Sequence, residues 1–174
     1  MNELEALNLA IEREKEAHRR YGEAAARTTD EKGKKMFSWL ASEEMGHVRI
    51  LERERESVKE SGTWLSEEEW ASGDELTQPI ERSEFPSLSE VKGELDTAAP
   101  ELEILKQAIE AEKEAASFYA ELAEIVSDSN GKAMLTKLSD VEKGHRDLLE
   151  EEYEWLRRSR KFFPLHRFTL PSSA

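Results

Sequence analysis

The sequence predicts an all-α fold, a four-helix bundle made of two duplicated helical hairpins. Glu, Lys, Ala and Leu dominate its 174 residues, whereas Gly (8) and Pro (5) are few, and this composition favours helix over sheet. Apolar residues recur at spacings of three and four along four long segments, as they do on the buried face of a helix. Residues 4–56 also align without a gap with residues 102–154, and 25 of these 53 pairs are identical.

Charge and composition limit the classes of function. The chain has 25 Lys and Arg against 39 Asp and Glu, a formal net charge of −14, which disfavours nucleic acid and anionic membranes as partners. The lack of cysteine excludes disulfides, thiolate nucleophiles and cysteine-bound metals. No apolar run approaches the roughly 20 residues of a membrane span, and residues 1–5 lack the features of a signal peptide. We therefore expect one cytoplasmic domain, residues 1–174.

The internal repeat has a constant offset of 98 residues. Tyr21 aligns with Tyr119, and His47 aligns with His145. Two unrelated acidic helices would share Glu and Ala through composition alone, but they would not share tyrosine and histidine in register. The repeat therefore indicates duplication of a helical hairpin.

The first hairpin is predicted over residues 2–59. Its first helix runs from about residue 2 to residue 27, and a break follows at residues 28–30. Thr29 or Asp30 can cap the second helix, which runs to about residue 59.

Residues 60–100 are predicted to form a packed crossover. If a twofold axis relates the hairpins, the second and third helices run parallel, so this segment must return along the length of the bundle. Segments that begin at Ser66 and Ser87 resemble capping boxes that open short helices. The segment also carries apolar side chains that a flexible linker would not need: Trp64, Trp70, Ile80 and Phe85.

The second hairpin is predicted over residues 101–158. It repeats the pattern of the first, with a helix to about residue 126, a break at residues 127–131 and a final helix to about residue 158. Four helices of this length make a bundle.

Residues 159–174 are predicted to be a basic, apolar and non-helical tail. The stretch from Trp155 onward has five Lys and Arg and no acidic residue, so the body up to Glu154 carries −19 (−14 − 5). We expect the tail to pack on the acidic bundle of its own chain or of a second subunit. A docking peptide for a partner or a protein shell is the alternative.

Glutamate and histidine interrupt the apolar stripes of all four helices at equivalent positions. The second and fourth helices each carry Glu-x-x-His within the stripe, which puts both side chains on one helical face. The first and third helices each carry one inward-facing glutamate, 30 residues before the glutamate of the following motif (44 − 14 and 142 − 112). These predicted site residues are Glu14, Glu44, His47, Glu112, Glu142 and His145.

Burial of four carboxylates needs compensating positive charge. No Lys or Arg occupies the same stripes, whereas two divalent cations would supply +4 against −4. One glutamate from each of two helices plus Glu-x-x-His from each of the other two is the di-iron or di-manganese arrangement of helical bundles. Oxygen and nitrogen ligands suit iron or manganese, and they can also hold zinc or cobalt. A single Glu-x-x-His would be weak evidence, and a duplicated surface motif is the less favoured alternative.

The chain resembles the rubrerythrin-like branch of the ferritin-like superfamily over residues 2–158. The resemblance rests on Ala-Ile-Glu-x-Glu-Lys-Glu-Ala, which is followed by Tyr21 and Tyr119 in the two copies, and on Glu-Met-Gly-His and Glu-Lys-Gly-His. It implies a carboxylate-bridged di-metal centre held by the six predicted residues. It also implies that Glu44 and Glu112, or their repeat equivalents, bridge the two metals.

The resemblance implies a di-iron or di-manganese oxidoreductase that acts on hydrogen peroxide or dioxygen. It also implies a role in the response to oxidative stress. We give peroxide reduction first, iron oxidation and storage second, a manganese catalase-like activity third and a structural metal site fourth. We expect iron as the metal, with manganese as the alternative, in a homodimer or higher homo-oligomer.

Two departures from the family pattern affect the predicted chemistry. Rubrerythrins carry a cysteine-ligated rubredoxin domain, so here electrons would come from a separate protein or a small reductant. Ala115 stands where rubrerythrins have an additional glutamate. Near the site, His18 is more simply a boundary residue than a ligand. We likewise interpret Tyr21 and Tyr119 as core residues with satisfied hydroxyl groups, and as ligand contacts or electron relays in the alternative.

Overall fold

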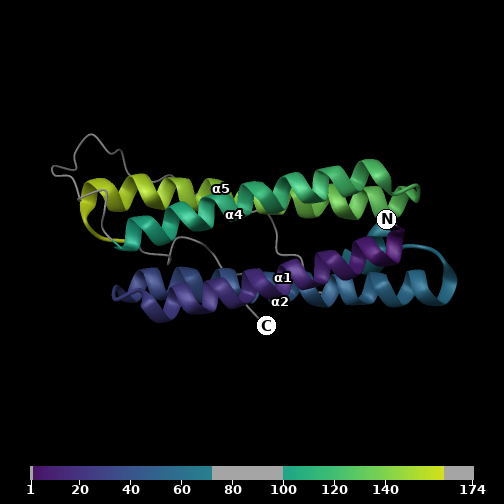
Figure 1. Ribbon diagram of the computed structural model, residues 1–174, viewed down its shortest axis with the longest axis horizontal. Helices are drawn as coiled ribbons and strands as arrows, with labels where there is room; N and C mark the ends of the chain where they lie inside the picture. Colours follow the sequence, from purple (N-terminus) through teal and green to yellow (C-terminus); the bar gives the residue numbers. More distant parts are fainter. Residues whose placement is uncertain (1, 72–99, 163–174) are drawn as a thin grey trace.

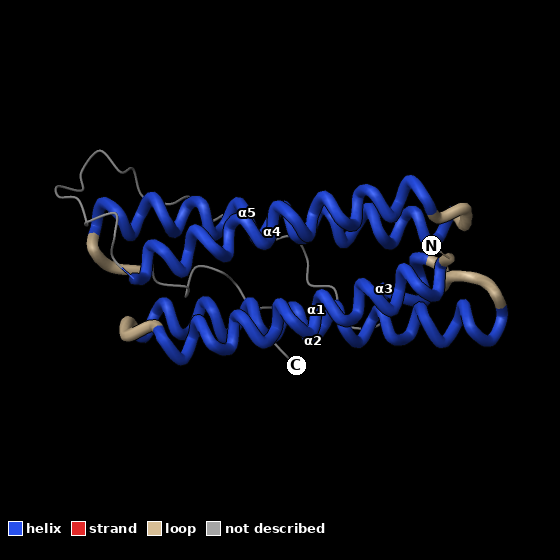
Figure 2. The backbone as a smooth tube through the Cα atoms, viewed as in Figure 1, coloured by secondary structure: helices blue, strands red, loops and turns tan. Residues whose placement is uncertain are grey.

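The computed structural model describes residues 2–71 and 100–162, which form two antiparallel helical hairpins lying side by side (Figure 1). The first hairpin comprises α1 (Glu3–Arg27) and α2 (Glu31–Ser61), and the second comprises α4 (Pro100–Ile125) and α5 (Ser129–Ser159). The short helix α3 (Glu67–Ala71) follows α2. The described residues contain no strand (Figure 2). The predicted all-α bundle of two helical hairpins is confirmed.

Polar side chains cap the beginnings of three long helices. Asn2 and Glu5 form a reciprocal capping box at α1, with both hydrogen bonds at 2.9 Å. Asp30 accepts from the backbone N–H of Lys32 at the start of α2, and Asp128 accepts in the same way at the start of α5. Because Asp128 is the cap, α5 begins at Ser129, earlier than the predicted break allows.

The second helix of each hairpin ends with a residue in the left-handed conformation. α2 is followed by Gly62 with φ of 76°, and α5 is followed by Arg160 with φ of 62°. Glycine adopts this conformation without strain, whereas arginine does so at a cost. Gly62 and Arg160 are separated by 98 residues (160 − 62), the offset of the sequence repeat. The structural repeat therefore continues beyond the predicted helix ends at residues 59 and 158.

Two crossed aromatic contacts, Trp64 on Gly131 and Phe162 on Gly33, join the hairpins. A Cβ on Gly131 would lie 2.7 Å from the Trp64 ring, and a Cβ on Gly33 would lie 2.8 Å from the Phe162 ring. Each aromatic residue follows the second helix of one hairpin and packs on the second helix of the other. Both rings are buried. The aromatic residue that follows the second helix of each hairpin thus packs on the beginning of the second helix of the other hairpin.

The described part of the crossover packs as predicted. Ser66 and Glu69 form the expected capping box, in which each backbone N–H donates to the other's side chain, at 2.8 and 3.4 Å. Trp64 and Trp70 are both buried. α2 and α4 run in the same direction (Figure 1). The second capping box at Ser87, Ile80, Phe85 and the tail after Phe162 lie outside the described residues.

Two apolar clusters fill the bundle, one toward each end. The first surrounds Trp64 and includes Leu7, Ile11 and Leu138. The second surrounds Phe162 and includes Tyr21, Phe37 and Leu105. The polar residues described below lie between them along the helices, so apolar side chains shield these residues from water at both ends.

Among the described residues, three glutamates away from the predicted site are also buried: Glu43, Glu54 and Glu152. Glu54 is fully buried in α2, and its Oε2 accepts a hydrogen bond of 2.9 Å from the Leu65 N–H, whereas its Oε1 has no hydrogen-bond partner. Burial raises the pKa of Glu54 to about 7; Asp128 and Glu69 add to the increase, while the Leu65 N–H and Arg53 oppose it.

Glu54→Gln is expected to remove a pH dependence of stability. The pKa is higher in the folded chain than in the unfolded one, so between about pH 4.5 and pH 7 the folded state holds the extra proton. The unfolding free energy of the wild type should therefore fall as pH rises through this range, by on the order of 2 kcal/mol relative to the variant. Urea unfolding of both metal-free proteins at pH 5 and pH 8 tests this, and equal pH dependence would contradict it.

No described helix combines the length and hydropathy needed to cross a membrane.

Candidate metal centre

The structure brings all six predicted site residues together between the hairpins. Each side chain occupies a position on a buried helical stripe where periodicity calls for an apolar residue. The neighbouring stripe residues Leu40 in α2 and Leu138 in α5 are fully buried. The six residues are themselves at most 3% exposed: Glu14, Glu44, His47, Glu112, Glu142 and His145.

His47 faces three carboxylates. Its Nδ1 lies 3.4 Å from Glu14 Oε2, 3.1 Å from Glu44 Oε2 and 3.1 Å from Glu142 Oε1. A single N–H group cannot donate to three acceptors from different helices with good geometry. This convergence is typical of ligands arranged around a cation.

His145 repeats this arrangement through the pseudo-twofold axis. Its Nδ1 lies 3.0 Å from Glu142 Oε2, 3.4 Å from Glu44 Oε1 and 3.9 Å from Glu112 Oε1. The side chains therefore form two four-residue groups, each with ligand atoms within 4.8 Å of one another. Both groups contain Glu44 and Glu142. The shared pair thus joins the two Glu-x-x-His motifs and differs from the pairing of Glu44 with Glu112 that the family resemblance implies.

The residues present fit two divalent ions. Glu44 Oε1 and Glu142 Oε1 are buried without a hydrogen-bond partner, which is costly for a carboxylate unless another positive group satisfies it. Within the described ranges, the two histidines are the only cationic side chains paired with these glutamates. Oxygen and imidazole nitrogen are the ligands that iron and manganese accept.

Burial and mutual repulsion distribute protons unevenly among the carboxyl groups. Burial raises the pKa of Glu14 and Glu112 well above the usual range, and the charges of Glu44 and Glu142 add to this. Burial also acts to raise the pKa of Glu44, but hydrogen bonds from His145 and His47 outweigh it and hold this pKa well below the usual value.

The same opposition sets the charge of the histidines. Burial acts to lower the pKa of His47 and His145, but contacts with Glu142 and other carboxylates raise both values well above normal. Interactions with the histidines also leave the pKa of Glu142 lowered, although burial and Glu44 oppose this. The metal-free centre is thus balanced by protons, and divalent ions must compete with these protons for the ligands.

Two tyrosines hold the outer glutamates from across the hairpin interface. Tyr21 of α1 donates a hydrogen bond to Glu112 of α4, and Tyr119 of α4 donates one to Glu14 of α1. Both rings are buried. The hydroxyl groups donate to the candidate ligands themselves, so the structure favours the alternative interpretation, ligand contacts, over that of core residues without a role at the site. The tyrosines orient these carboxylates.

His18 is not part of either group. Its Nδ1 lies 2.7 Å from the carbonyl oxygen of Ala41, within the first hairpin. In the second hairpin, Ser139 replaces Ala41 in the repeat and donates to the carbonyl oxygen of Ala116, which replaces His18. The polar side chain comes from the first helix of the first hairpin and from the second helix of the second hairpin. In both hairpins a side chain bonds to a backbone carbonyl of the paired helix at the same repeat position.

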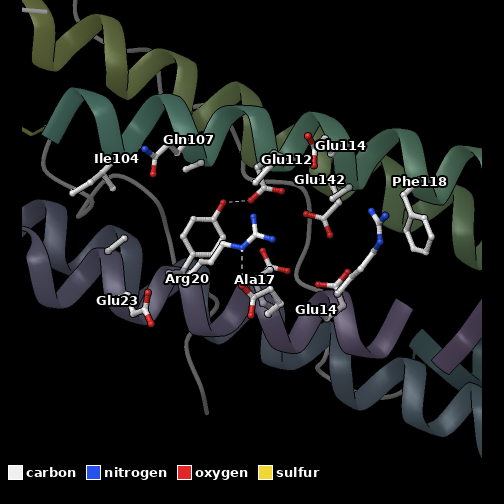
Figure 3. Close-up of a pocket in the computed structure, with 18 of the residues that line it drawn as sticks. Glu14, Ala17, Arg20, Glu23, Ile104, Gln107, Glu112, Glu114, Phe118 and Glu142 are labelled. Atoms are coloured by element: carbon white, nitrogen blue, oxygen red, sulfur yellow. Dashed lines mark hydrogen bonds and ion pairs between the residues drawn. The ribbon is translucent and has the colours of Figure 1, made fainter. Parts of the chain in front are cut away.

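A groove of about 700 Å³ between α1 and α4 leads to the centre. Glu14, Glu44, Glu112 and Glu142 are among its lining residues, and Figure 3 shows Glu14, Glu112 and Glu142 between the helices. The helices within each hairpin pack closely along their length, whereas α1 and α4 approach each other closely at few positions. The carboxylates therefore lie at the floor of this groove, on the side where α1 and α4 are least closely packed.

Sequence reasoning missed one aromatic neighbour of the centre. The partly buried Trp39 meets His145 edge to face, with ring centroids 5.9 Å apart. Its repeat equivalent is Lys137, so this contact breaks the twofold symmetry. The sequence did contain a signal for this contact, because Trp39 is an aromatic residue at a position where the second copy has lysine.

Comparison with known proteins identifies the family of the chain. The rubrerythrin family model matches residues 5–153 and, in a second match, residues 103–167. The chain belongs to the rubrerythrin family. Rubrerythrins typically bind a di-iron centre, and the buried glutamates and histidines are compatible with one. The predicted membership of the ferritin-like superfamily is confirmed.

One solved structure shares the fold along most of the chain. A hypothetical protein from Pyrococcus furiosus is 28% identical, with 94% of each chain covered and a TM-score of 0.65. A comparison with curated proteins found no match.

Proposed function

We propose that this rubrerythrin uses two metal ions, held by the six residues of the centre, to reduce hydrogen peroxide. The convergence of three carboxylates on each histidine Nδ1 is the observation that supports this most strongly. Iron is the proposed metal and manganese the alternative. When bound, the ions would supply redox equivalents and Lewis acidity for cleavage of the oxygen–oxygen bond.

The surrounding residues set the conditions for this chemistry. Tyr21 and Tyr119 fix the outer carboxylates Glu112 and Glu14, and the apolar clusters exclude water from both ends. The groove between α1 and α4 admits the oxidant. Because the chain lacks cysteine, we propose that electrons arrive from a separate donor.

A second candidate function is ferroxidase activity with iron storage. While the centre holds no metal, the groove lining carries eight glutamates against three arginines, and such an acidic lining attracts ferrous ions. Storage would also need a large assembly. We propose a homodimer or higher homo-oligomer located in the cytoplasm.

Anaerobic loading of the metal-free protein with Fe(II) tests the proposed function. We expect two irons per chain, and rapid mixing should show oxidation by peroxide at least about tenfold faster than by dioxygen. Optical absorbance follows the oxidation, and the wild type without iron is the control. Faster oxidation by dioxygen, with turnover beyond two irons per chain, would favour the storage function, and failure to bind two ions would contradict both.

A further inference from the structure

The groove between α1 and α4 is much larger than peroxide or dioxygen requires. Its volume is about 700 Å³, whereas a molecule with two heavy atoms needs roughly the space of one or two water molecules, about 30–60 Å³. This volume lies within the range of roughly 300–1,000 Å³ that is usual for sites of organic ligands. The groove therefore has room for a second, organic reactant.

The walls of the groove suit a flat apolar molecule. Ile104 and Phe118 lie toward its two ends (Figure 3). Small side chains from both helices line the space between these two residues and leave a slot over the carboxylates. These side chains are Ala17, Ala24, Ala108, Ala111 and Ala115.

Guanidinium groups lie beside this slot. Arg13 stacks on the Phe118 ring, with Cζ 4.1 Å from the ring centroid. Arg20 pairs with Glu16 through Nε at 3.2 Å and lies over the groove in Figure 3. Arginine stacks on aromatic faces and donates hydrogen bonds to oxygen atoms, so both features favour an oxygen-bearing aromatic ligand.

The charge of the lining favours a neutral ligand. Four of its eight glutamates belong to the metal centre, where two divalent ions would balance them. The others are Glu12, Glu16, Glu23 and Glu114, and the lining also contains Arg13, Arg20 and Arg27. The remaining formal charge is −1 (+3 − 4), which gives neither a strong anion site nor a strong cation site.

We propose that this groove binds a neutral aromatic hydroquinone, which would supply the electrons for the proposed peroxide reduction. The inference rests on the proposed peroxide reduction and names its electron donor. The hydroquinone loses two electrons and two protons to become the quinone, and hydrogen peroxide accepts both pairs to become two molecules of water. No separate electron-transfer protein is then needed.

Binding of 1,4-naphthohydroquinone to the full chain tests the proposal. The protein is loaded anaerobically with Fe(II), and equilibrium dialysis without oxidant measures binding. Ala111→Trp, which fills the slot, should weaken binding by about tenfold or more. Ala120→Trp is the matched control, because Ala120 is an exposed residue of α4 outside the groove lining, and it should bind as the wild type does. All three proteins should hold the same number of irons. Cyclohexane-1,4-diol, which lacks the aromatic ring, should not bind.

Two results would overturn the proposal: no saturable binding to the iron-loaded wild type, or equal binding by the wild type and Ala111→Trp. A second experiment adds hydrogen peroxide to the iron-loaded protein with bound hydroquinone. If the proposal holds, the wild type should form one quinone per peroxide consumed. In Ala111→Trp, quinone formation should slow, whereas Ala120→Trp should form quinone at the wild-type rate. Hydroquinone binding without any oxidation of iron by peroxide would instead contradict the proposed function and leave the groove assignment intact.

Discussion

Glu142→Gln is expected to abolish tight binding of both metal ions, whereas Glu112→Gln should abolish binding of only one. Glu142 contributes an oxygen to both groups, and Glu112 contributes to the group around His145 alone. Loss of a shared carboxylate removes charge and a ligand atom from both sites together. Mutation of a residue that only hydrogen-bonds a metal ligand typically lowers metal affinity by about 10–100-fold. Loss of a ligand itself should cost more, so we expect the affinity for each ion to fall by on the order of 100-fold or more.

Metal analysis after dialysis at limiting free Fe(II) distinguishes the two variants. The expected numbers of tightly held ions are two for the wild type, one for Glu112→Gln and none for Glu142→Gln. Glu152→Gln is the matched control, because Glu152 is an equally buried glutamate of α5 outside both groups. Loss of one ion only from Glu142→Gln would show that Glu142 is not shared. Circular dichroism verifies that each variant remains helical.

Trp64→Ala is expected to lower the unfolding free energy by about 3–5 kcal/mol, the usual cost of truncating a buried large aromatic residue. The ring is 3% exposed, packs on Gly131 and donates from Nε1 to Glu3 at 3.1 Å. Its removal opens one end of the interface between the hairpins. Urea unfolding of the metal-free protein measures the effect without the contribution of metal binding.

A glycine pair in α5 supplies the control for this contact. Gly131→Ala should destabilise the wild type by about 1–3 kcal/mol, because its Cβ would lie 2.7 Å from the Trp64 ring and 2.8 Å from Val126. Gly144→Ala meets nothing within 4 Å and should stabilise the helix by roughly 0.5–1 kcal/mol. The Gly131→Ala penalty should shrink in the Trp64→Ala background. An unchanged penalty would mean that the ring does not press on this glycine.

The sequence predicted the helices and the six buried polar residues because both depend on local periodicity. A residue three or four positions from Leu40 or Leu138 lies on the same helical face whatever the partner helix. The 98-residue offset strengthened this inference, since the same interruption occurs twice. The repeat also contained a missed signal: Glu54 and Glu152 occupy equivalent stripe positions and are both buried.

Features that depend on how the hairpins meet could not be predicted in this way. The axial alignment of α2 with α5 determines which carboxylates belong to both groups. The residue spacing within a single helix carries no information about this alignment. The sequence also gave no means to foresee that Tyr21 reaches Glu112 across the interface. The groove arises from the separation of α1 and α4, a distance set by packing elsewhere in the bundle.

The crossed aromatic contacts indicate how the fold arose. Each metal-binding group draws residues from both hairpins, and Trp64 and Phe162 hold the two hairpins together at opposite ends. This is the arrangement expected of an ancestral homodimer of single hairpins with its centre on the symmetry axis. Fusion into one chain released the two copies from identity. The first copy could then carry Arg13 where the second has Ala111, and Arg20 where the second has Phe118. One half could thus specialise in charge and the other in apolar contact, an asymmetry that a symmetric dimer cannot acquire.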